Sequence, residues 1–252
     1  MDNKQIDVKI NEHIETLGNG INVIVSEIHK FNTDTVILAD FSLPKKYETA
    51  IELGSGCGAI PLIWNKKNVP LSTIAVEIQK DACDMLNRSI KLNDLNEKIK
   101  VLNIDMKDIT SEYFGKFDIV VCNPPYKKAG SGIKNDLEGK SIARHEKDIN
   151  INEICRIASK LLKFGGRFCV CQRPERLTDV ITAFRNCNLE PKRMKFVQQR
   201  KDKPSKLFLL EGRKGGNPGG MVMLPTLFIE NDVGQFSDDM KDIYGDFYKN
   251  KN

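Results

Sequence analysis

Several features that define other protein classes are missing from this sequence. No run of about 18 apolar residues occurs, so no membrane-spanning helix and no membrane partner are predicted. The opening stretch, MDNKQIDVKINEH, lacks the apolar core of a secretory signal, and a cytoplasmic protein is therefore expected. The seven cysteines are odd in number and irregularly spaced, without a C-x-x-C pair, and only three histidines accompany them. A disulfide framework and a bound metal are therefore not expected.

Charge is also limited overall, but it is unevenly distributed. The formal net charge is +5, which by itself does not establish nucleic-acid binding. Residues 190–214 carry nine Lys or Arg against three acids, whereas the chain from Glu230 onward carries six acids and three lysines. The basic segment fits a phosphate-binding surface, and it fits an ordinary solvated rim equally well.

Short apolar runs alternate with helical patterns through the middle of the chain. Strands are predicted at 49–53, 72–77, 98–104, 117–122 and 166–171, and helices at 59–67, 80–93 and 151–162. Continuous apolar strands that alternate with helices indicate an α/β fold whose mostly parallel sheet is covered by helices on both faces. Two further runs, at 192–200 and 205–213, predict an antiparallel pair that finishes a seven-stranded sheet at one edge.

The ends of the chain are expected to be additions to this core. Residues 1–45 are predicted to form an extension with one strand at 20–28 and a short helix after FNTDTVILADF. Residues 46–214 are predicted to be the core domain, and 215–252 a loop and tail that begin with KGGNPGG.

A glycine turn follows the first core strand in the stretch IELGSGCGAIPLI. Gly54, Gly56 and Ala59 satisfy the loose dinucleotide pattern, so NAD has to be considered. S-adenosylmethionine is favoured because acids mark three strand ends. Glu52 precedes the turn, where it can orient a charged amino-acid group, and Glu77 ends the second strand, where a carboxylate can accept ribose hydroxyl protons. Asp105, after the third strand, can meet an adenine amino group.

The fourth strand ends abruptly in the residues Asn-Pro-Pro-Tyr. Parallel sheets bind ligands beyond the carboxyl ends of their strands, so this corner is expected beside the cofactor. Two acceptors, the Asn123 side-chain oxygen and the Pro124 carbonyl, can hold the two protons of a planar amino group. Pro125 stiffens the corner, and Tyr126 offers a face for stacking a base. The pattern predicts methylation of an amino nitrogen, and it leaves open which amino group is the acceptor.

Taken together, these motifs resemble those of the bacterial tRNA1(Val) (adenine-37-N6)-methyltransferase family over roughly residues 15 to 230. The resemblance rests on FNTDTVILADF, IELGSGCGAIPLI, AVEIQKDACDMLNRSIKLN, VVCNPPY, SIARHE, LLKFGGRFCVCQRPERL and LEPKRMKFV. It implies a Rossmann-like class I methyltransferase fold and methyl transfer from S-adenosylmethionine to adenine N6 in tRNA, with S-adenosylhomocysteine as product. It further implies a monomer or homodimer without an obligate protein partner.

The motifs and the resemblance together define three groups of candidate residues. The catalytic candidates are Asn123, Pro124, Pro125 and Tyr126. The cofactor candidates are Thr33, Asp34, Glu52, Gly54, Ser55, Gly56, Gly58, Glu77, Ile78, Asp105, Met106 and Asn123. The RNA-binding candidates are Lys127, Lys128, Arg144, Lys192, Arg193, Arg200 and Lys201. Thr33 and Asp34 are expected to close over the methionine end of the cofactor, and the loop that leads to Arg144 is expected to fold over the target base or its backbone.

Three other functions remain open from the sequence. The Asn-Pro-Pro-Tyr corner suits a protein glutamine N5-methyltransferase that acts on release factors, although such enzymes usually have a longer helical N-terminal domain. It also suits a guanine-N2 methyltransferase of ribosomal RNA. A non-catalytic RNA-binding module with the same fold is less compatible with intact Asn123 and Glu77.

Overall fold

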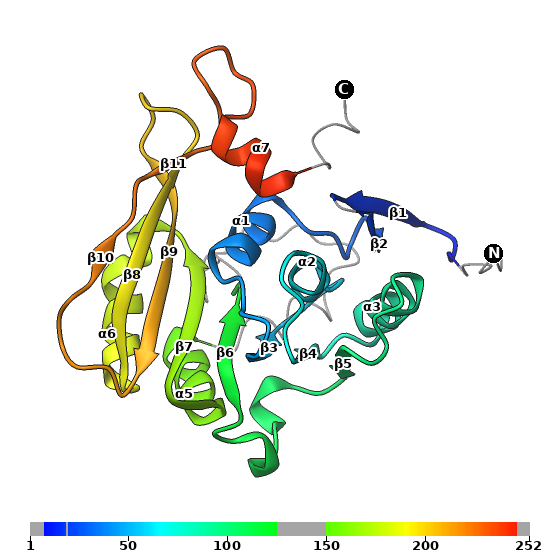
Figure 1. Cartoon of the computed structure of the whole chain (residues 1–252), viewed down its shortest axis with the longest axis horizontal. Coiled ribbons are helices and arrows are strands. Elements are labelled where there is room, and N and C mark those ends of the chain that lie inside the picture. Colours follow the sequence, from blue (N-terminus) through cyan, green and yellow to red (C-terminus); the bar gives the residue numbers. More distant parts are fainter. Residues whose placement is uncertain (1–7, 19, 125–149, 246–252) are drawn as a thin grey trace, which may run out of the picture.

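Parallel strands form the centre of the protein (Figure 1). Most of their side chains are buried. The computed structural model describes residues 8–18, 20–124 and 150–245. The strands of the main sheet follow the order β10-β8-β9-β7-β6-β3-β4-β5, and β11 also pairs with β8. Their bounds are β3 Thr49–Leu53, β4 Ser72–Val76, β5 Ile99–Leu102, β6 Phe117–Cys122, β7 Leu162–Gln172, β8 Leu189–Gln198, β9 Ser205–Lys214, β10 Val222–Met223 and β11 Leu227–Phe228.

The directions of the strands confirm the predicted fold class. β3 pairs in parallel with β4 and β6, β4 with β5, and β6 with β7. β9 is antiparallel to both β7 and β8, so β8 again runs in the direction of the parallel strands. The antiparallel strand therefore lies between β7 and β8, and the short strands β10 and β11 extend the sheet beyond β8.

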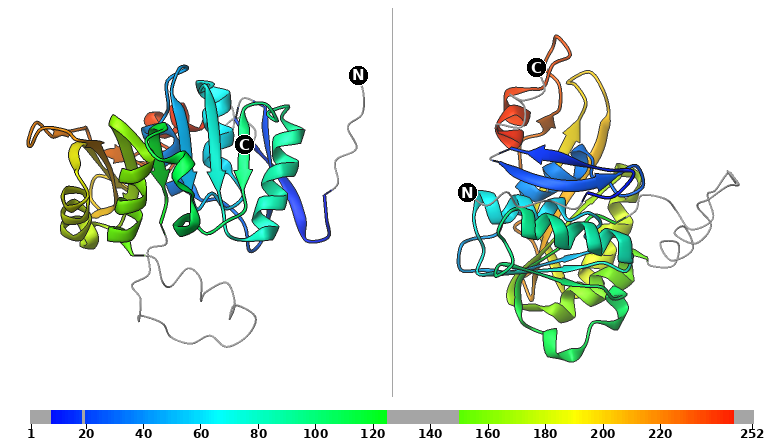
Figure 2. Two further views of the ribbon diagram at one scale, coloured as in Figure 1. Left: turned by 90° about the horizontal axis from the view of Figure 1, so that it is seen from below. Right: turned by 90° about the vertical axis from the view of Figure 1, so that its right-hand side faces the viewer.

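Helices cover both faces of the sheet, as the alternation of side chains along its strands requires (Figure 2). On β6, Ile119 and Val121 pack with the side chains of α1, α2 and α3. Val120 and Cys122 point the other way and pack with α5 and α6. The helices are α1 Thr33–Phe41, α2 Ala59–Lys67, α3 Lys80–Leu92, α5 Ile151–Leu161, α6 Leu177–Asn186 and α7 Asp238–Tyr244, with 3-10 turns η1 Met106–Asp108, η2 Ser111–Tyr113 and η3 Pro174–Arg176.

The N-terminal segment differs in detail from its prediction. The expected strand at 20–28 is present as β2, Ile21–Ser26, and it forms a hairpin with a strand that was not predicted, β1, Glu12–Leu17. The helix α1 lies within FNTDTVILADF and not after it, because the Asn32 side chain caps its first turn by accepting a hydrogen bond from the Thr35 amide. The hairpin is attached to α3, since the Ile24 amide donates to Ser89 Oγ at 2.9 Å and Arg88 pairs with Glu12.

The segment after β9 returns along the sheet and ends against α1. β10 and β11 pair with β8, and α7 then packs near the start of α1. The Tyr244 hydroxyl donates to Thr33 Oγ1 at 3.3 Å, and Lys67 Nζ donates to the carbonyl oxygen of Ile243 at 2.8 Å. No helix within the described residues is long and apolar enough to cross a membrane.

The junction between β3 and α2 depends on one glycine. Gly58 caps α2 with a φ of +82°, in the left-handed region that side chains disfavour. A β-carbon placed there would lie 2.1 Å from Cδ1 of Leu86 on α3, so the absence of a side chain lets α3 pack against the turn.

Replacement of Gly58 by alanine should therefore destabilise the fold through both strain and overlap. We expect Gly58→Ala to cost about 2–5 kcal/mol, the sum of left-handed strain and overpacking. Gly115→Ala is the matched control, because Gly115 has a φ of +65° but open space where its β-carbon would lie. It should cost only about 1–2 kcal/mol in urea unfolding, and equal losses in the two variants would contradict a packing role for Gly58.

Candidate functional site

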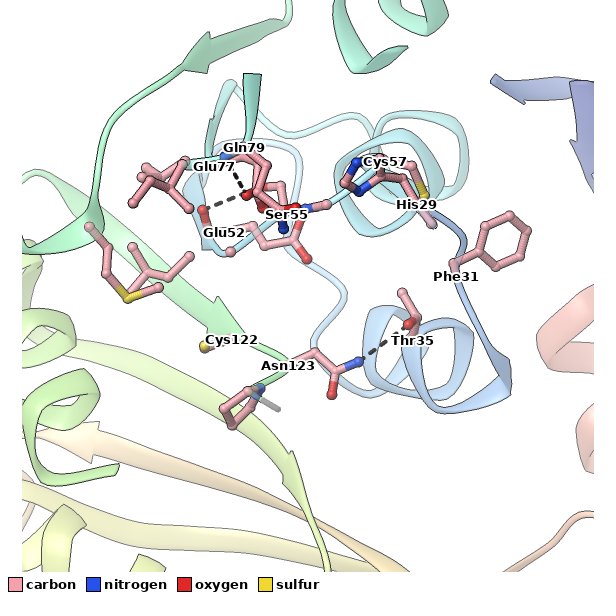
Figure 3. Close-up of a pocket in the computed structure, with 18 of the residues that line it drawn as sticks. His29, Phe31, Thr35, Glu52, Ser55, Cys57, Glu77, Gln79, Cys122 and Asn123 are labelled. Atoms are coloured by element: carbon pink, nitrogen blue, oxygen red, sulfur yellow. Dashed lines mark hydrogen bonds between the residues drawn. The ribbon is translucent and has the colours of Figure 1, made fainter. Parts of the chain in front are cut away.

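A cavity of about 440 Å³ opens at the carboxyl ends of β3, β4, β5 and β6 (Figure 3). The parallel register brings these four ends to one edge of the sheet. Residues from the segment that leads into α1 close another side of the cavity. The lining includes Ile28, His29, Lys30, Phe31, Asn32, Thr35, Glu52, Gly54, Ser55, Gly56, Glu77, Ile78, Gln79, Asp105, Met106, Asn123 and Pro124.

The glycine turn is held in place by hydrogen bonds that its amides donate to the last residue of β4. The amides of Gly54 and Ser55 donate to the carbonyl oxygen of Val76 at 2.9 and 3.0 Å. Glu77 accepts the Gly56 amide on Oε2 at 2.8 Å and the Gln79 amide on Oε1 at 2.9 Å. Both carboxylate oxygens of Glu77 are therefore oriented by the backbone, which places a rigid anionic group in the wall of the cavity.

Glu52 is the most unusual charged residue of the site. It is only 2% exposed, and its Oε2 has no hydrogen-bond partner among the described residues. Burial raises the pKa of the Glu52 carboxyl well above its ordinary value, and the nearby charge of Glu77 acts in the same direction. A buried acceptor without a partner is costly, so the site is built to receive a donor, and a cationic amino group would be the strongest.

The two thiols beside these acids are not nucleophiles. Cys57 and Cys122 are buried, and burial next to Glu52 raises the pKa of the Cys57 thiol to about 12. The same causes raise the pKa of Cys122. Both thiols thus remain protonated at neutral pH and act as small apolar residues of the wall.

The far side of the cavity carries residues that follow β5. Asp105 caps η1, since its Oδ1 accepts the Lys107 amide at 2.9 Å, and its Oδ2 lies 3.3 Å from Lys107 Nζ. Met106 lies next to the glycine turn, where the β-carbon position at Gly54 is 3.8 Å from its Cε. Ile78 is partly exposed at the same wall. This arrangement combines a carboxylate with apolar surface, as a bound nucleoside base requires.

Asn123 stands at the end of β6 and faces the start of α1. Its Nδ2 donates to Thr35 Oγ1 at 3.2 Å, and Figure 3 shows the amide nitrogen turned toward the threonine. Thr35 Oγ1 in turn donates to Asn32 Oδ1 at 3.0 Å. Pro124, directly after Asn123, is buried and also lines the cavity.

The cavity therefore brings together most of the described candidate residues, but not all of them. Thr33 and Asp34 are not among its lining residues; Thr33 instead accepts a hydrogen bond from Tyr244. Gly58 serves the packing of α3. Pro125, Tyr126, Lys127, Lys128 and Arg144 lie outside the described residues.

Asn32 and Thr35 line the site without having been predicted. Asn is a preferred N-cap residue, and this signal could have placed the start of α1 at the correct residue. The contact between Thr35 and Asn123 joins residues 88 positions apart, and no local pattern indicates it.

The four described basic candidates lie near opposite ends of the strand β8. Arg200 and Lys201 follow the carboxyl end of β8, on the edge where the cavity opens, and Lys201 is exposed there. Lys192 and Arg193 lie near the other end of β8. The Arg193 side chain stacks on the ring of Phe41 at 4.5 Å and pairs with Glu211 at 2.9 Å, so it is engaged within the fold. Lys192 Nζ donates to the carbonyl oxygens of Asn217 and Gly219.

The sequence matches a known protein family. Residues 29–198, more than half of the chain, match the model of the methyltransferase small domain family. The chain belongs to this family, and it is an S-adenosylmethionine-dependent methyltransferase. The orphaned Glu52 oxygen, the rigid Glu77 carboxylate and the open glycine turn fit that cofactor. No cluster of three potential metal ligands occurs in the part of the chain that the structure describes.

Several curated relatives of the chain carry the name tRNA1(Val) (adenine(37)-N6)-methyltransferase. The protein of this name from Tolumonas auensis is 25% identical over 194 residues, which cover 73% of this chain and 77% of the relative. The one from Yersinia pestis is 23% identical over 229 residues, which cover 88% of both chains. These comparisons confirm the family resemblance that the motifs indicated.

Solved structures with the same fold include other methyltransferases. A predicted O-methyltransferase from Agrobacterium tumefaciens superposes with a TM-score of 0.67 at 18% identity, over 84% of this chain and 95% of that one. TYW2 from M. jannaschii, solved in complex with AdoMet, gives a TM-score of 0.55 at 16% identity, over 81% of this chain and 86% of that one. At these identities the likeness establishes the fold alone.

The buried carboxyl of Glu52 leads to a prediction about stability and pH. Glu52→Gln should raise the free energy of unfolding at neutral pH by about 1 kcal/mol or more, because the Glu52 carboxyl ionises readily only in the unfolded state, which favours unfolding, whereas an amide stays neutral in both states. Below the ordinary Glu pKa of 4.5 the carboxyl is protonated in both the folded and the unfolded state. As the pH rises toward the raised folded-state pKa, the wild type alone loses stability. Urea unfolding between about pH 4 and pH 7 measures this difference.

The same substitution should weaken cofactor binding while the fold gains stability. Calorimetry with S-adenosylmethionine is the measurement, and Glu77→Gln is the contrasting variant. Both Glu77 oxygens accept backbone N–H groups, so an amide at that position removes one acceptor and should destabilise the turn. A Glu52→Gln protein that is less stable at neutral pH and binds the cofactor as well as wild type would contradict the role given to Glu52.

Proposed function

We propose that this methyltransferase modifies the exocyclic N6 of an adenine in tRNA, with A37 of the anticodon loop of tRNA1(Val) as its target. The observation that carries the proposal is the position of Asn123 and Pro124 in the wall of the cofactor cavity. The names of the curated relatives support the tRNA substrate. A cytoplasmic location and a monomeric or homodimeric state stay predictions.

The proposed roles of the residues divide between holding the cofactor and holding the acceptor. Glu52 would pair with the amino group of the cofactor, Glu77 with its ribose hydroxyls, and Asp105 with its adenine. S-adenosylmethionine, when bound, supplies a methyl group on a positively charged sulfur. The chain itself need only present a nitrogen to it in the correct orientation.

Presentation of the nitrogen is the role proposed for the corner after β6. The lone pair of an aromatic amine is delocalised into the ring, which makes the nitrogen a poor nucleophile. Acceptance of its two protons by Asn123 Oδ1 and the Pro124 carbonyl would favour the pyramidal form, in which the lone pair is available. Because the nitrogen can release its proton after it gains the methyl group, the reaction requires no residue with a strongly shifted pKa to act as base.

The placement of the basic side chains supports a nucleic-acid substrate on the same edge. Arg200 and the exposed side chains of Lys201, Lys203 and Lys206 surround the connection between β8 and β9. This connection lies at the carboxyl end of β8, and the cavity opens along that edge of the sheet. The positive charge there would attract phosphates near the cavity. Of the four described RNA-binding candidates, Arg200 and Lys201 are therefore favoured over Lys192 and Arg193.

A transfer assay distinguishes the proposed acceptor from its alternatives. The protein is incubated with methyl-labelled S-adenosylmethionine and, separately, with unmodified bulk tRNA, ribosomal RNA or release factor. We expect label in tRNA, recovered as N6-methyladenosine after digestion and mass spectrometry. Label confined to release factor, as N5-methylglutamine, would overturn the tRNA proposal, and N2-methylguanosine in ribosomal RNA would favour the other alternative.

Substitution of Asn123 tests the acceptor corner. Asn123→Ala should lower kcat by about 10²–10³-fold, the usual cost of losing one group that stabilises a transition state, while the dissociation constant of the cofactor changes little. Calorimetry and single-turnover transfer measure the two quantities. A parallel loss of cofactor binding would mean that Asn123 belongs to the cofactor site instead.

A further inference from the structure

The start of α1 and the end of β6 are joined by a chain of three hydrogen bonds. The Thr35 amide and the Thr35 hydroxyl both donate to Asn32 Oδ1, each at 3.0 Å. The Asn123 side-chain nitrogen donates to Thr35 Oγ1 at 3.2 Å. The three side chains all line the cofactor cavity.

Which atom donates and which accepts in each of these hydrogen bonds follows from the protons that are available. A backbone N–H can only donate, so the Asn32 side-chain atom that it contacts must be the oxygen. That oxygen can only accept, so the Thr35 hydroxyl must donate its single proton to it. Thr35 Oγ1 then has only lone pairs for its third partner, and the arm of the Asn123 amide that faces it must be the nitrogen.

We propose that Thr35, held by Asn32, is a positioning residue that fixes which arm of the Asn123 amide faces the acceptor nitrogen. With Nδ2 committed to Thr35, the amide presents Oδ1 on its other arm. This proposal rests on the proposed function, because the orientation matters only if Asn123 receives the protons of an amino group. A rotation of the amide by a half turn would place two N–H donors where an acceptor is required.

The orientation of the Asn123 amide depends on its hydrogen-bond partners, and Thr35 Oγ1 is one of them. The nitrogen and oxygen of an asparagine amide have nearly the same size, so packing alone does not discriminate between the two orientations. The two orientations are distinguished by a partner that can only donate or only accept. Thr35 Oγ1 can only accept from Asn123, because the Thr35 hydroxyl proton is already donated to Asn32, the N-cap of α1. The capping of α1 thus affects the orientation of the Asn123 amide, 88 positions along the chain from Thr35.

Two substitutions of Thr35 separate its hydroxyl from its shape. Thr35→Val keeps the volume and removes both hydrogen bonds of the hydroxyl, and we expect kcat to fall about tenfold, as loss of one net hydrogen bond predicts. The dissociation constant of S-adenosylmethionine should stay within about twofold by the same reasoning, since the hydroxyl is directed to protein partners. Thr35→Ser keeps the hydroxyl and should recover most of the rate.

A matched control excludes a general effect of removing a threonine hydroxyl that donates to an asparagine side chain. Thr16 Oγ1 donates to Asn22 Oδ1 at 2.9 Å in the β1–β2 hairpin, which is the same kind of bond away from the cavity. Thr16→Val should leave kcat unchanged. A loss of rate in Thr16→Val equal to that in Thr35→Val would overturn the proposal.

A double-mutant cycle tests whether Thr35 acts through Asn123. In the Asn123→Ala background Thr35→Val should have no further effect on kcat, because no amide remains to be oriented. A further tenfold loss, additive with that of Asn123→Ala, would contradict the positioning role.

A spectroscopic readout keeps this test independent of the methyl acceptor. In protein labelled with ¹⁵N-asparagine, the Asn123 side-chain resonance, assigned by its absence in Asn123→Ala, should shift in Thr35→Val and return toward its original position in Thr35→Ser. An unchanged resonance in Thr35→Val would overturn the proposal even if tRNA methylation is confirmed. A shifted resonance without transfer to any acceptor would instead refute the proposed function.

Discussion

The parallel pairing of β3 with β4 and β6 is the constraint on which the rest of the site depends. It brings the carboxyl ends of three buried strands to one edge of the sheet, so that Glu52, Glu77 and Asn123 share one cavity although they are far apart in the sequence. Side chains that alternate along each strand are buried under helices on both faces, which makes the register rigid. The positions of these groups are therefore set by the core of the fold.

The two acids of this edge show how the same scaffold gives similar groups different properties. Glu77 accepts two backbone amides and holds the glycine turn in place. Glu52, near the end of the adjacent strand, is buried, and one of its oxygens has no partner among the residues that the structure describes; burial raises its pKa. Such a group lowers the stability of the empty fold and gains a partner only when a donor enters. The stability that the empty fold loses at Glu52 is thus regained when a ligand binds, as is common for a site that is preformed in the absence of its ligand.

The sequence predicted the core of the fold because each strand there is a continuous apolar run that ends in a recognisable residue. TAIEL, STIAVE and FDIVVC agree closely with β3, β4 and β6, and the two acids and the amide at or next to their carboxyl ends line the cavity. The ends of the chain were harder to predict. The strand β1, with the sequence EHIETL, is half exposed and shows no clear alternation of buried and exposed side chains, and β10 and β11 have only two residues each. Thr33 and Asp34 lie in the first turn of α1 and are not among the residues that line the cavity, whereas the third residue of the helix, Thr35, contacts Asn123. Contacts between distant segments, such as this one, are decided by packing and leave no local signal.

The central claim is that the cofactor cavity and the Asn-Pro corner form one reaction site for an adenine amino group. A crystal structure with a bisubstrate analogue, in which adenosine N6 is linked covalently to the amino-acid part of the cofactor, tests it most directly. The account predicts the amino-acid group at Glu52, with the adenine N6 within hydrogen-bond distance of Asn123 Oδ1 and the Pro124 carbonyl. An adenine bound elsewhere, or an Asn123 amide that turns its nitrogen toward N6, would contradict it.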